Sequence, residues 1–207
     1  VLTREEIQRF LIQAKAEGYF ELFLLELTTG LRRGELLALQ WDDLNLETGE
    51  LQVTKQVYRT KEDGLLISQP KTKSSIRTVS LPPTLLNILK EYKESVNSRW
   101  MFPAPVKEDS PLDPAYIRTR LHLILEHAQC KQIRFHDLRH TFATIALGNG
   151  MDVKTLSAML GHVSAATTLD IYTHITNPMR SEAAAKIDQR IAKVDPKEKE
   201  VASERAP

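Results

Sequence analysis

The sequence predicts an α+β protein that is mainly helical and carries a small three-stranded antiparallel sheet on its side. Apolar residues recur at helical spacing before residue 40 and again through the back half of the chain. Between Leu44 and Leu81 the period changes to two, and the turn signals Thr48-Gly49 and Glu62-Asp63-Gly64 separate strand-like segments. Of the 207 residues, 42% are hydrophobic, which is enough for one good-sized domain or two small ones.

Three helices are expected before residue 40. Thr3 and Glu6 match a capping box, in which each side chain satisfies a free N–H group of the first turn, so the first helix should begin there. A second helix is expected over about 19–27 and a third over about 32–39, with Gly30 as the turn between them.

The middle of the chain should form the sheet and the back half should be helical. Pro82-Pro83 ends the strand region, Thr84 is expected to cap the next helix, and a Pro-rich connection covers 103–111. The strand-like segments are residues 51–53, 57–58, 65–67 and 76–81. The later helices are expected at about 84–96, from near Pro114, and at about 137–147, 153–160, 165–173 and 179–193.

Composition excludes several classes of protein. Glu21 and Glu26 interrupt the densest apolar stretch, 20–27, so no run is long enough to span a membrane. The single cysteine, Cys130, excludes an internal disulfide and a cysteine-based zinc site, which fits a reducing, cytoplasmic setting. Residues 195–207 hold almost nothing apolar, so we expect a flexible tail behind one domain of residues 1–194.

The net charge of +1 does not itself indicate nucleic acid, but positive charge is concentrated in two places. No acidic residue lies between Gly64 and Glu91, and a second excess follows residue 130. Clustered cations on a neutral protein indicate a site for a polyanion, although a solvated basic hairpin would have the same composition. The first cluster is Lys71, Lys73, Arg77 and Lys90, and the second is Lys131, Arg134, Arg139 and His140 against Asp137.

Two segments in the front half suit a phosphate. In 28–35, Arg32 follows Gly30 at the start of a helix, where free N–H groups and a guanidinium together attract an anion. In 70–77, a lysine beside other cations could act as a general acid because its neighbours lower its pKa. The alternatives are a helix whose arginines face solvent and a flexible surface loop.

Two segments in the back half complete the pattern. His136, Arg139 and His140 have i, i+3 and i+4 spacing and so share one helix face, which suits an anionic substrate. The alternatives are hydrogen-bonded core histidines or a histidine metal pair, which Arg139 on the same face weakens. Gly161-His162 precedes Tyr172, a poor nucleophile unless cations surround it; otherwise Tyr172 is a boundary tyrosine.

Together and in this order, these segments resemble the catalytic domain of tyrosine recombinases, the phage integrase family. The resemblance covers about residues 1–190. Within the family, the chain is most similar in type to integrases of Gram-positive temperate phages and conjugative transposons. It implies the tyrosine-recombinase fold and a site-specific DNA recombinase. Such an enzyme integrates and excises a mobile element through a 3′-phosphotyrosine intermediate.

The resemblance also implies a role for each matching residue. The implied catalytic residues are Arg32, Lys71, His136, Arg139, His162 and Tyr172, with Glu35 in support and with Lys73 and Arg77 as DNA-binding residues. Lys73 is also the rival of Lys71 for the role of general acid, and Arg33 matches no position with a family role.

The resemblance further implies that the reaction uses no metal and no other cofactor. Its implied partners are double-stranded DNA at the element ends and target site, and further copies in a homotetramer formed through the C-terminal helix, without any membrane. Its location would be the bacterial cytoplasm at the nucleoid. The core-binding and arm-binding domains that usually precede this domain are expected to be absent, since the chain starts at Val1.

Three alternatives stay open. A type IB topoisomerase uses a similar residue set and would relax supercoiled DNA without a defined site. A catalytically silent DNA-binding module would bind DNA without forming an adduct, and a histidine-based metalloenzyme would hold zinc.

Overall fold

The computed structural model describes residues 1–69, 75–107 and 109–161. No helix in these ranges has both the length and the apolar character needed to cross a membrane. The helices are α1 (Arg4–Ala16), α2 (Phe20–Thr29), α3 (Arg33–Leu37), α4 (Pro83–Glu94), α5 (Pro114–His127), α6 (Phe135–Gly148) and α7 (Val153–Leu160), with a 3-10 turn at Trp41–Asp43. The strands are β1 (Glu50–Val53), β2 (Gln56–Thr60), β3 (Gly64–Ser68) and β4 (Arg77–Ser80).

The predicted helix boundaries are confirmed where local signals define them. The Thr3 hydroxyl accepts from the Glu6 N–H and the Glu6 carboxylate accepts from the Thr3 N–H, so the capping box opens α1. Gly30 ends α2 in the left-handed conformation, with φ of 61°. The cap of α4 is Pro82 rather than Thr84, because Pro83 already occupies the first helical position. The helices expected at 165–173 and 179–193 lie outside the described residues.

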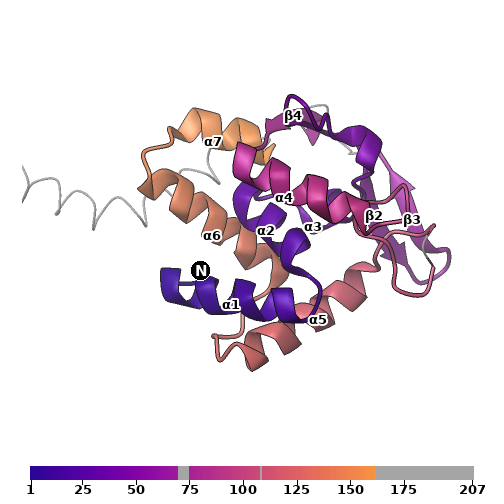
Figure 1. Ribbon diagram of the computed structural model, residues 1–207, viewed down its shortest axis with the longest axis horizontal. Helices are drawn as coiled ribbons and strands as arrows, with labels where there is room; N and C mark the ends of the chain where they lie inside the picture. The colour runs from indigo at the N-terminus through magenta and orange to yellow at the C-terminus, as the bar shows by residue number, and fades with distance from the viewer. Residues whose placement is uncertain (70–74, 108, 162–207) are drawn as a thin grey trace, which may run out of the picture.

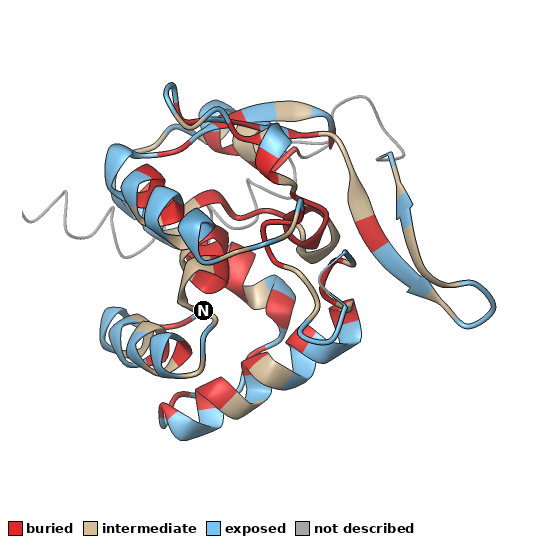
Figure 2. Cartoon of the chain, turned by 45° about the vertical axis from the view of Figure 1, so that its right-hand side comes forward, coloured by how far each residue is buried: buried red, intermediate tan, exposed pale blue. Residues whose placement is uncertain are grey.

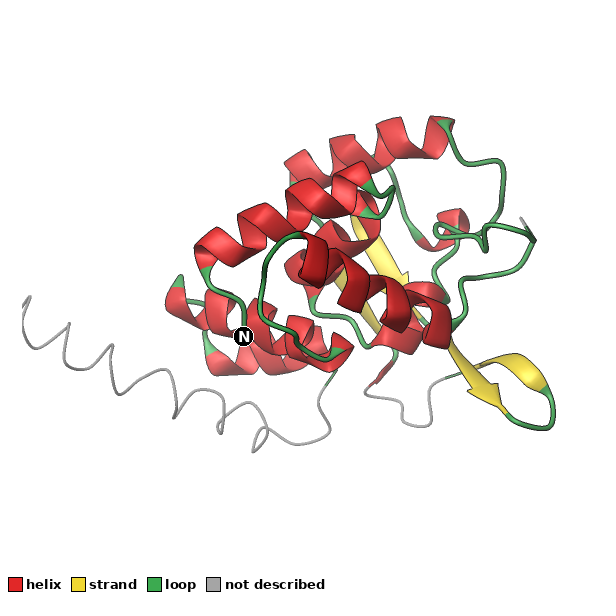
Figure 3. Cartoon of the chain, turned by 90° about the horizontal axis from the view of Figure 1, so that it is seen from below, coloured by secondary structure: helices red, strands yellow, loops and turns green. Residues whose placement is uncertain are grey.

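The single three-stranded sheet predicted from the sequence is wrong. The described strands form two separate antiparallel pairs, β1 with β4 and β2 with β3. The ladders separate because β1 buries Leu51 and Val53, whereas Val57 is the one buried residue of the β2–β3 hairpin. The hairpin therefore extends away from the helices (Figure 3), and apart from Val57 its residues are exposed or half-buried (Figure 2).

The hairpin is nevertheless fixed to the body of the protein. Gly34 of α3 lies against the backbone of β2, where a Cβ would come 2.6 Å from the Val57 carbonyl oxygen. Arg59 of β2 also forms an ion pair with Asp113, the N-cap of α5. These contacts bring α3 and α5 together beside the hairpin.

Two hydrophobic cores meet at the end of α2. The larger core lies among α1, α2, α4 and α5, and a smaller one lies between α6 and α7, which run side by side at one end of the molecule (Figure 1). Gly30 lies at their junction, where a Cβ would come 2.4 Å from Phe142 and 2.9 Å from Leu160. The close approach that glycine allows here places the last turn of α7 beside the start of α3.

Candidate active site

The carbonyl groups at the end of α7 are bound by three arginines from other elements. The free carbonyls of a last helical turn carry partial negative charge and attract cations. Arg77 Nε donates to the Met159 carbonyl, Arg139 Nη2 donates to Leu160 at 2.6 Å, and Arg32 Nη2 donates to Gly161 at 2.7 Å. These bonds join α3, β4 and α6 to the end of α7.

The buried carboxylate of Glu35 holds two of these arginines. Glu35 is 1% exposed, and its oxygens lie 2.8 Å from Arg32 Nη1 and 2.9 Å from Arg77 Nη2. Burial raises the pKa of Glu35, but hydrogen bonds and charge from Arg77, together with hydrogen bonds from Arg32, outweigh it. The pKa therefore lies below its ordinary value and the group is ionised at neutral pH.

Arg139 is the most deeply buried of the three arginines. It is 3% exposed and donates from Nη1 to the Gly30 carbonyl at 2.6 Å, in addition to its bond with Leu160. Burial lowers the pKa of Arg139 to about 10, and the charge of Arg32 adds to the lowering, so the side chain stays charged at neutral pH. A guanidinium has five N–H donors, which leaves donors for a ligand.

A second carboxyl group, Glu26 of α2, lies in the same region without a partner. It is fully buried, and neither carboxylate oxygen has a hydrogen bond among the described residues. Burial raises the pKa of Glu26 well above its ordinary value, and the charge of Arg139 opposes this rise only in part. Burial therefore favours the protonated, neutral form of Glu26.

Arg32, Arg139 and Glu26 line a cavity of about 430 Å³ between α2, α3, α5 and the start of α6. Apart from Glu26, whose neutral form burial favours, the titratable side chains of the wall are all basic, so the cavity suits an anion. Its charged and titratable lining residues are Glu26, Arg32, Arg33, Arg118, His122, Arg134, His136 and Arg139.

The two histidines at the start of α6 pack against each other. The rings of His136 and His140 meet edge to face, with centroids 4.7 Å apart. Partial loss of solvent lowers the pKa of His136, and positive charge on His140 and Arg139 lowers it further. His136 is exposed and Arg139 is buried, but both side chains line the cavity. The helix face predicted from their spacing therefore contributes both residues to the cavity wall.

Comparison with known proteins identifies the family of this chain. The sequence model of the Phage integrase family matches residues 1–179. The chain belongs to the phage integrase family. The XerC-like tyrosine recombinase of Caldanaerobacter subterraneus is 35% identical over 202 residues, covering 86% of this chain and 51% of that protein. The ICEBs1 integrase of Bacillus subtilis is 31% identical over 199 residues, covering 89% and 53%.

A solved structure shows the same fold. The integrase of transposon Tn1549, in complex with transposon right end DNA, superposes with a TM-score of 0.75 at 22% identity, covering 88% of this chain and 65% of that one. The integrase-family chain described here spans about half the length of the curated relatives named above.

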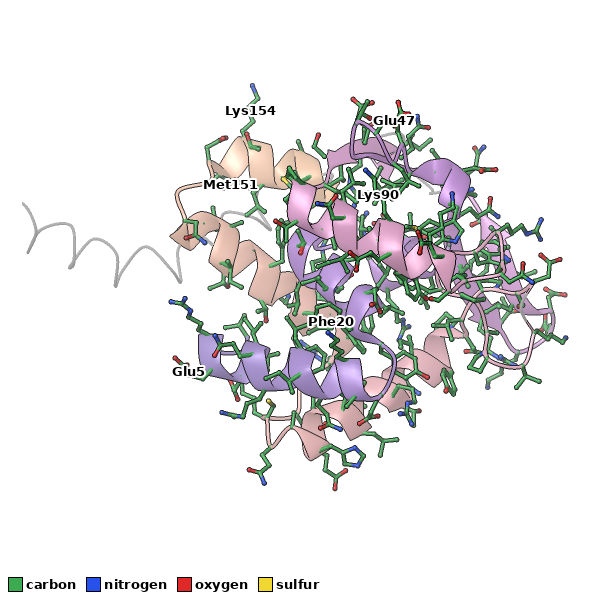
Figure 4. The ribbon with its side chains drawn as sticks, in the orientation of Figure 1. Glu5, Phe20, Glu47, Lys90, Met151 and Lys154 are labelled. Carbon is green, nitrogen blue, oxygen red and sulfur yellow. The ribbon has the colours of Figure 1, made fainter. Side chains whose placement is uncertain are left out.

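This integrase-family chain brings five of the predicted site residues into one cluster: Arg32, Glu35, Arg77, His136 and Arg139. The side chain of Arg77, which was expected to bind DNA, is only 7% exposed and binds Glu35 and backbone carbonyls. Lys90 of the basic window lies exposed on α4 (Figure 4) and does not line the cavity. The remaining predicted residues, Lys71, Lys73, His162 and Tyr172, lie outside the described residues.

Sequence reasoning missed three residues of the cavity wall. Arg118 and His122 belong to α5, to which no chemistry was assigned, and only the fold brings that helix to the site. Glu26 left a usable signal, because it is one of only two acidic residues in the apolar helical stretch 20–27. Within the described ranges, no three His, Cys, Asp or Glu side chains gather closely enough to hold a metal ion.

Proposed function

We propose that this chain cleaves and rejoins double-stranded DNA as the catalytic domain of an integrase that moves a mobile element. The observation that carries the proposal is the pair of the half-buried Arg32 and the buried Arg139, whose guanidinium groups line one positively charged cavity. Names of relatives support DNA as the substrate, since they include the ICEBs1 integrase and the DNA-bound Tn1549 integrase.

In this proposal, Tyr172 is the nucleophile. Its hydroxyl oxygen attacks the phosphorus and the bond to the 5′ oxygen breaks, which leaves a 3′-phosphotyrosine link and a free 5′-hydroxyl. Lys71 gives a proton to the leaving 5′ oxygen, and His136 takes the proton of Tyr172. Attack by a second 5′-hydroxyl reverses the step, so bond energy is retained and no nucleotide cofactor is needed.

The arginines supply electrostatic stabilisation. Phosphodiesters are so inert that catalysis must lower the barrier by on the order of 15–20 kcal/mol, which a single cation cannot do. Arg32 and Arg139 hold the two non-bridging oxygens as negative charge grows, and His162 adds a hydrogen bond. Arg77 acts through Glu35, whose carboxylate it shares with Arg32, and is therefore a positioning residue.

A covalent-trapping assay tests this function. The chain is mixed, in a metal chelator, with a nicked duplex carrying a candidate element end, so that the cleaved strand diffuses away and the adduct accumulates. We expect a protein–DNA band on a denaturing gel that Tyr172→Phe abolishes. An adduct that survives Tyr172→Phe, or one that forms only after magnesium is added back, would contradict the mechanism.

We also propose that the helix expected over 179–193, which lies outside the described residues, docks on a neighbouring copy in the DNA complex. Its apolar positions recur at helical spacing, as a docking helix requires. They are Ala183, Ala184, Ile187, Ile191 and Val194. The resulting assembly would be a homotetramer on DNA.

A further inference from the structure

Apart from His136, which packs against His140, the basic side chains of the cavity fall into two groups. Those of the first group already have partners: Arg32 binds Glu35, Arg139 binds the carbonyls of Gly30 and Leu160, Arg134 binds Asp137, and His122 binds Gln132. Arg33 and Arg118 form the second group, since neither side chain has a hydrogen bond or an ion pair with another described residue. The proposed mechanism uses neither of them.

Arg33 and Arg118 lie close to each other although they come from different elements. Arg33 opens α3 and Arg118 lies on α5, which packs against α3, and both line the cavity. Burial lowers the pKa of Arg33, and the positive charge of Arg118 is the other cause of this lowering. Two guanidinium groups without a counter-charge repel each other, and an anion between them would remove that cost.

The cavity has room for more than the phosphate that Arg32 and Arg139 would hold. Its volume of about 430 Å³ corresponds to roughly a dozen waters at about 30 Å³ each, whereas one phosphate group has five heavy atoms. On DNA, the neighbouring anion is the next phosphate of the same strand.

We propose that Arg33 and Arg118 form a second phosphate subsite, which binds the backbone phosphate next to the cleaved one on the same strand. This subsite rests on the proposed function, because it needs a DNA strand whose cleaved phosphate lies at Arg32 and Arg139. Its role is to position that strand, so Arg33 and Arg118 are binding residues and take no part in the proton transfers.

The subsite can be tested by neutralising single phosphates. Duplexes of the candidate element end are made with one uncharged methylphosphonate linkage at successive positions around the cleavage point, and affinity is measured by fluorescence anisotropy. We expect one flanking position to weaken binding about tenfold, the loss typical of a charge-assisted hydrogen-bonded contact. Arg33→Gln and Arg118→Gln should each weaken binding to unmodified DNA by a similar factor.

The combination of the two changes carries the decision. If the arginine and the phosphate bind each other, a variant that lacks the arginine gains nothing from the phosphate charge. Arg33→Gln or Arg118→Gln should therefore bind the duplex with the neutral linkage at that position as tightly as unmodified DNA. Losses that multiply at every position, or the absence of any sensitive flanking position, would overturn the subsite. The control is Arg99→Gln, which removes an exposed arginine paired with Asp109 outside the cavity and should leave the methylphosphonate profile unchanged.

The two proposals fail in different ways. The scan with the wild-type chain needs no variant, and Arg118→Gln changes an exposed side chain, so a folding defect of Arg33→Gln would not obscure the result. The same samples are run on the denaturing gel. An adduct without a sensitive flanking phosphate overturns the subsite alone, whereas a wild-type chain that forms no adduct overturns the proposed function.

Discussion

Glu26 is the residue whose chemistry depends most on its surroundings. Burial raises its pKa well above the ordinary value of 4.5, so the folded chain keeps a proton that the unfolded chain releases. Because the native state then binds more protons, the free energy of unfolding falls as pH rises from the unfolded pKa through the folded one. The slope over that window is about 1.4 kcal/mol per pH unit.

We therefore expect Glu26→Gln to be more stable than the wild type, by a margin that grows as pH rises above about 4.5. Urea unfolding at pH 5, 6, 7 and 8 measures this margin. The control is Glu21→Gln, which removes a carboxylate from the same helix outside the cavity. A margin that stays constant with pH would contradict a neutral Glu26.

His136 should set the acid limit of the reaction. Partial loss of solvent and the charges of His140 and Arg139 lower the pKa of His136 from 6.5, and the charge of Asp137 opposes this change. His136 is therefore protonated, and unable to take a proton, only at a pH below 6.5. The rate of adduct formation should thus begin to fall below pH 6.5.

Replacing His140 by glutamine removes one cause of the lowering, so the acid limb should move to higher pH. Adduct rates between pH 5 and 8 measure the shift, with His127→Gln at the far end of α5 as the control. An acid limb that is the same in His140→Gln and the wild type would contradict this role.

At the scale of elements, α7 presents three successive carbonyls to three arginines. Its C-cap is Gly161, with φ of 62°, and a Cβ there would come 2.9 Å from Arg77 Nη1. Gly150 also has a positive φ, of 89°, but faces open space, so an added methyl group there meets nothing. Alanine would strain the backbone at both positions, but only at Gly161 would it also contact a residue of the site.

Gly161→Ala and Gly150→Ala should each lower the free energy of unfolding by about 1 kcal/mol, because alanine is strained at positive φ. Only Gly161→Ala should also reduce the rate of adduct formation, by about tenfold or more, since it displaces Arg77 from Glu35 and the α7 carbonyls. Urea unfolding and the trapping assay measure the two effects. Equal rates of adduct formation in the two variants would show that the hydrogen bonds between the arginines and the α7 carbonyls do not affect the reaction.

The elements were predictable from sequence where a few neighbouring residues decide them. Thr3 with Glu6 defined the start of α1, and Gly30 defined the end of α2, because capping is local chemistry. The sheet was not predictable, since β1 pairs with β4 across the whole β2–β3 hairpin and its register depends on burial against helices. The buried role of Arg77 has the same origin, because Glu35 is 42 residues away.

At the scale of the whole molecule, family membership followed from the order of short motifs, while the shape of the cavity did not. Arg32, His136 and Arg139 each stood in a recognisable segment. Arg118 lines the same cavity from α5, and no spacing in the sequence relates it to Arg33. The motifs therefore predicted the type of reaction, whereas tertiary packing determines which further cations line the cavity.

The proposed tetramer gives a prediction at this scale. Deleting residues 179–207 should leave binding of a single copy to a half-site duplex within about twofold, because the cavity and its arginines are untouched. On a duplex with two half-sites, the deletion should remove the slower complexes that contain several copies. Native gels measure both, and slower complexes that survive the deletion would contradict docking through this helix.

The arginine bonds at the end of α7 also connect distant parts of the chain. Arg32 lies 129 residues from Gly161, and Arg139 lies 109 residues from Gly30. A ribosome that adds about 5–20 residues per second needs roughly 6–26 s to travel from the first of these arginines to the carbonyl it binds. Throughout that time Arg32 lacks the Gly161 carbonyl, one of the groups that orient it. The arginines of the anion site are thus fully arranged only after α7 has been synthesised, and a chain that stalls within α6 would carry several of these arginines but not their arrangement.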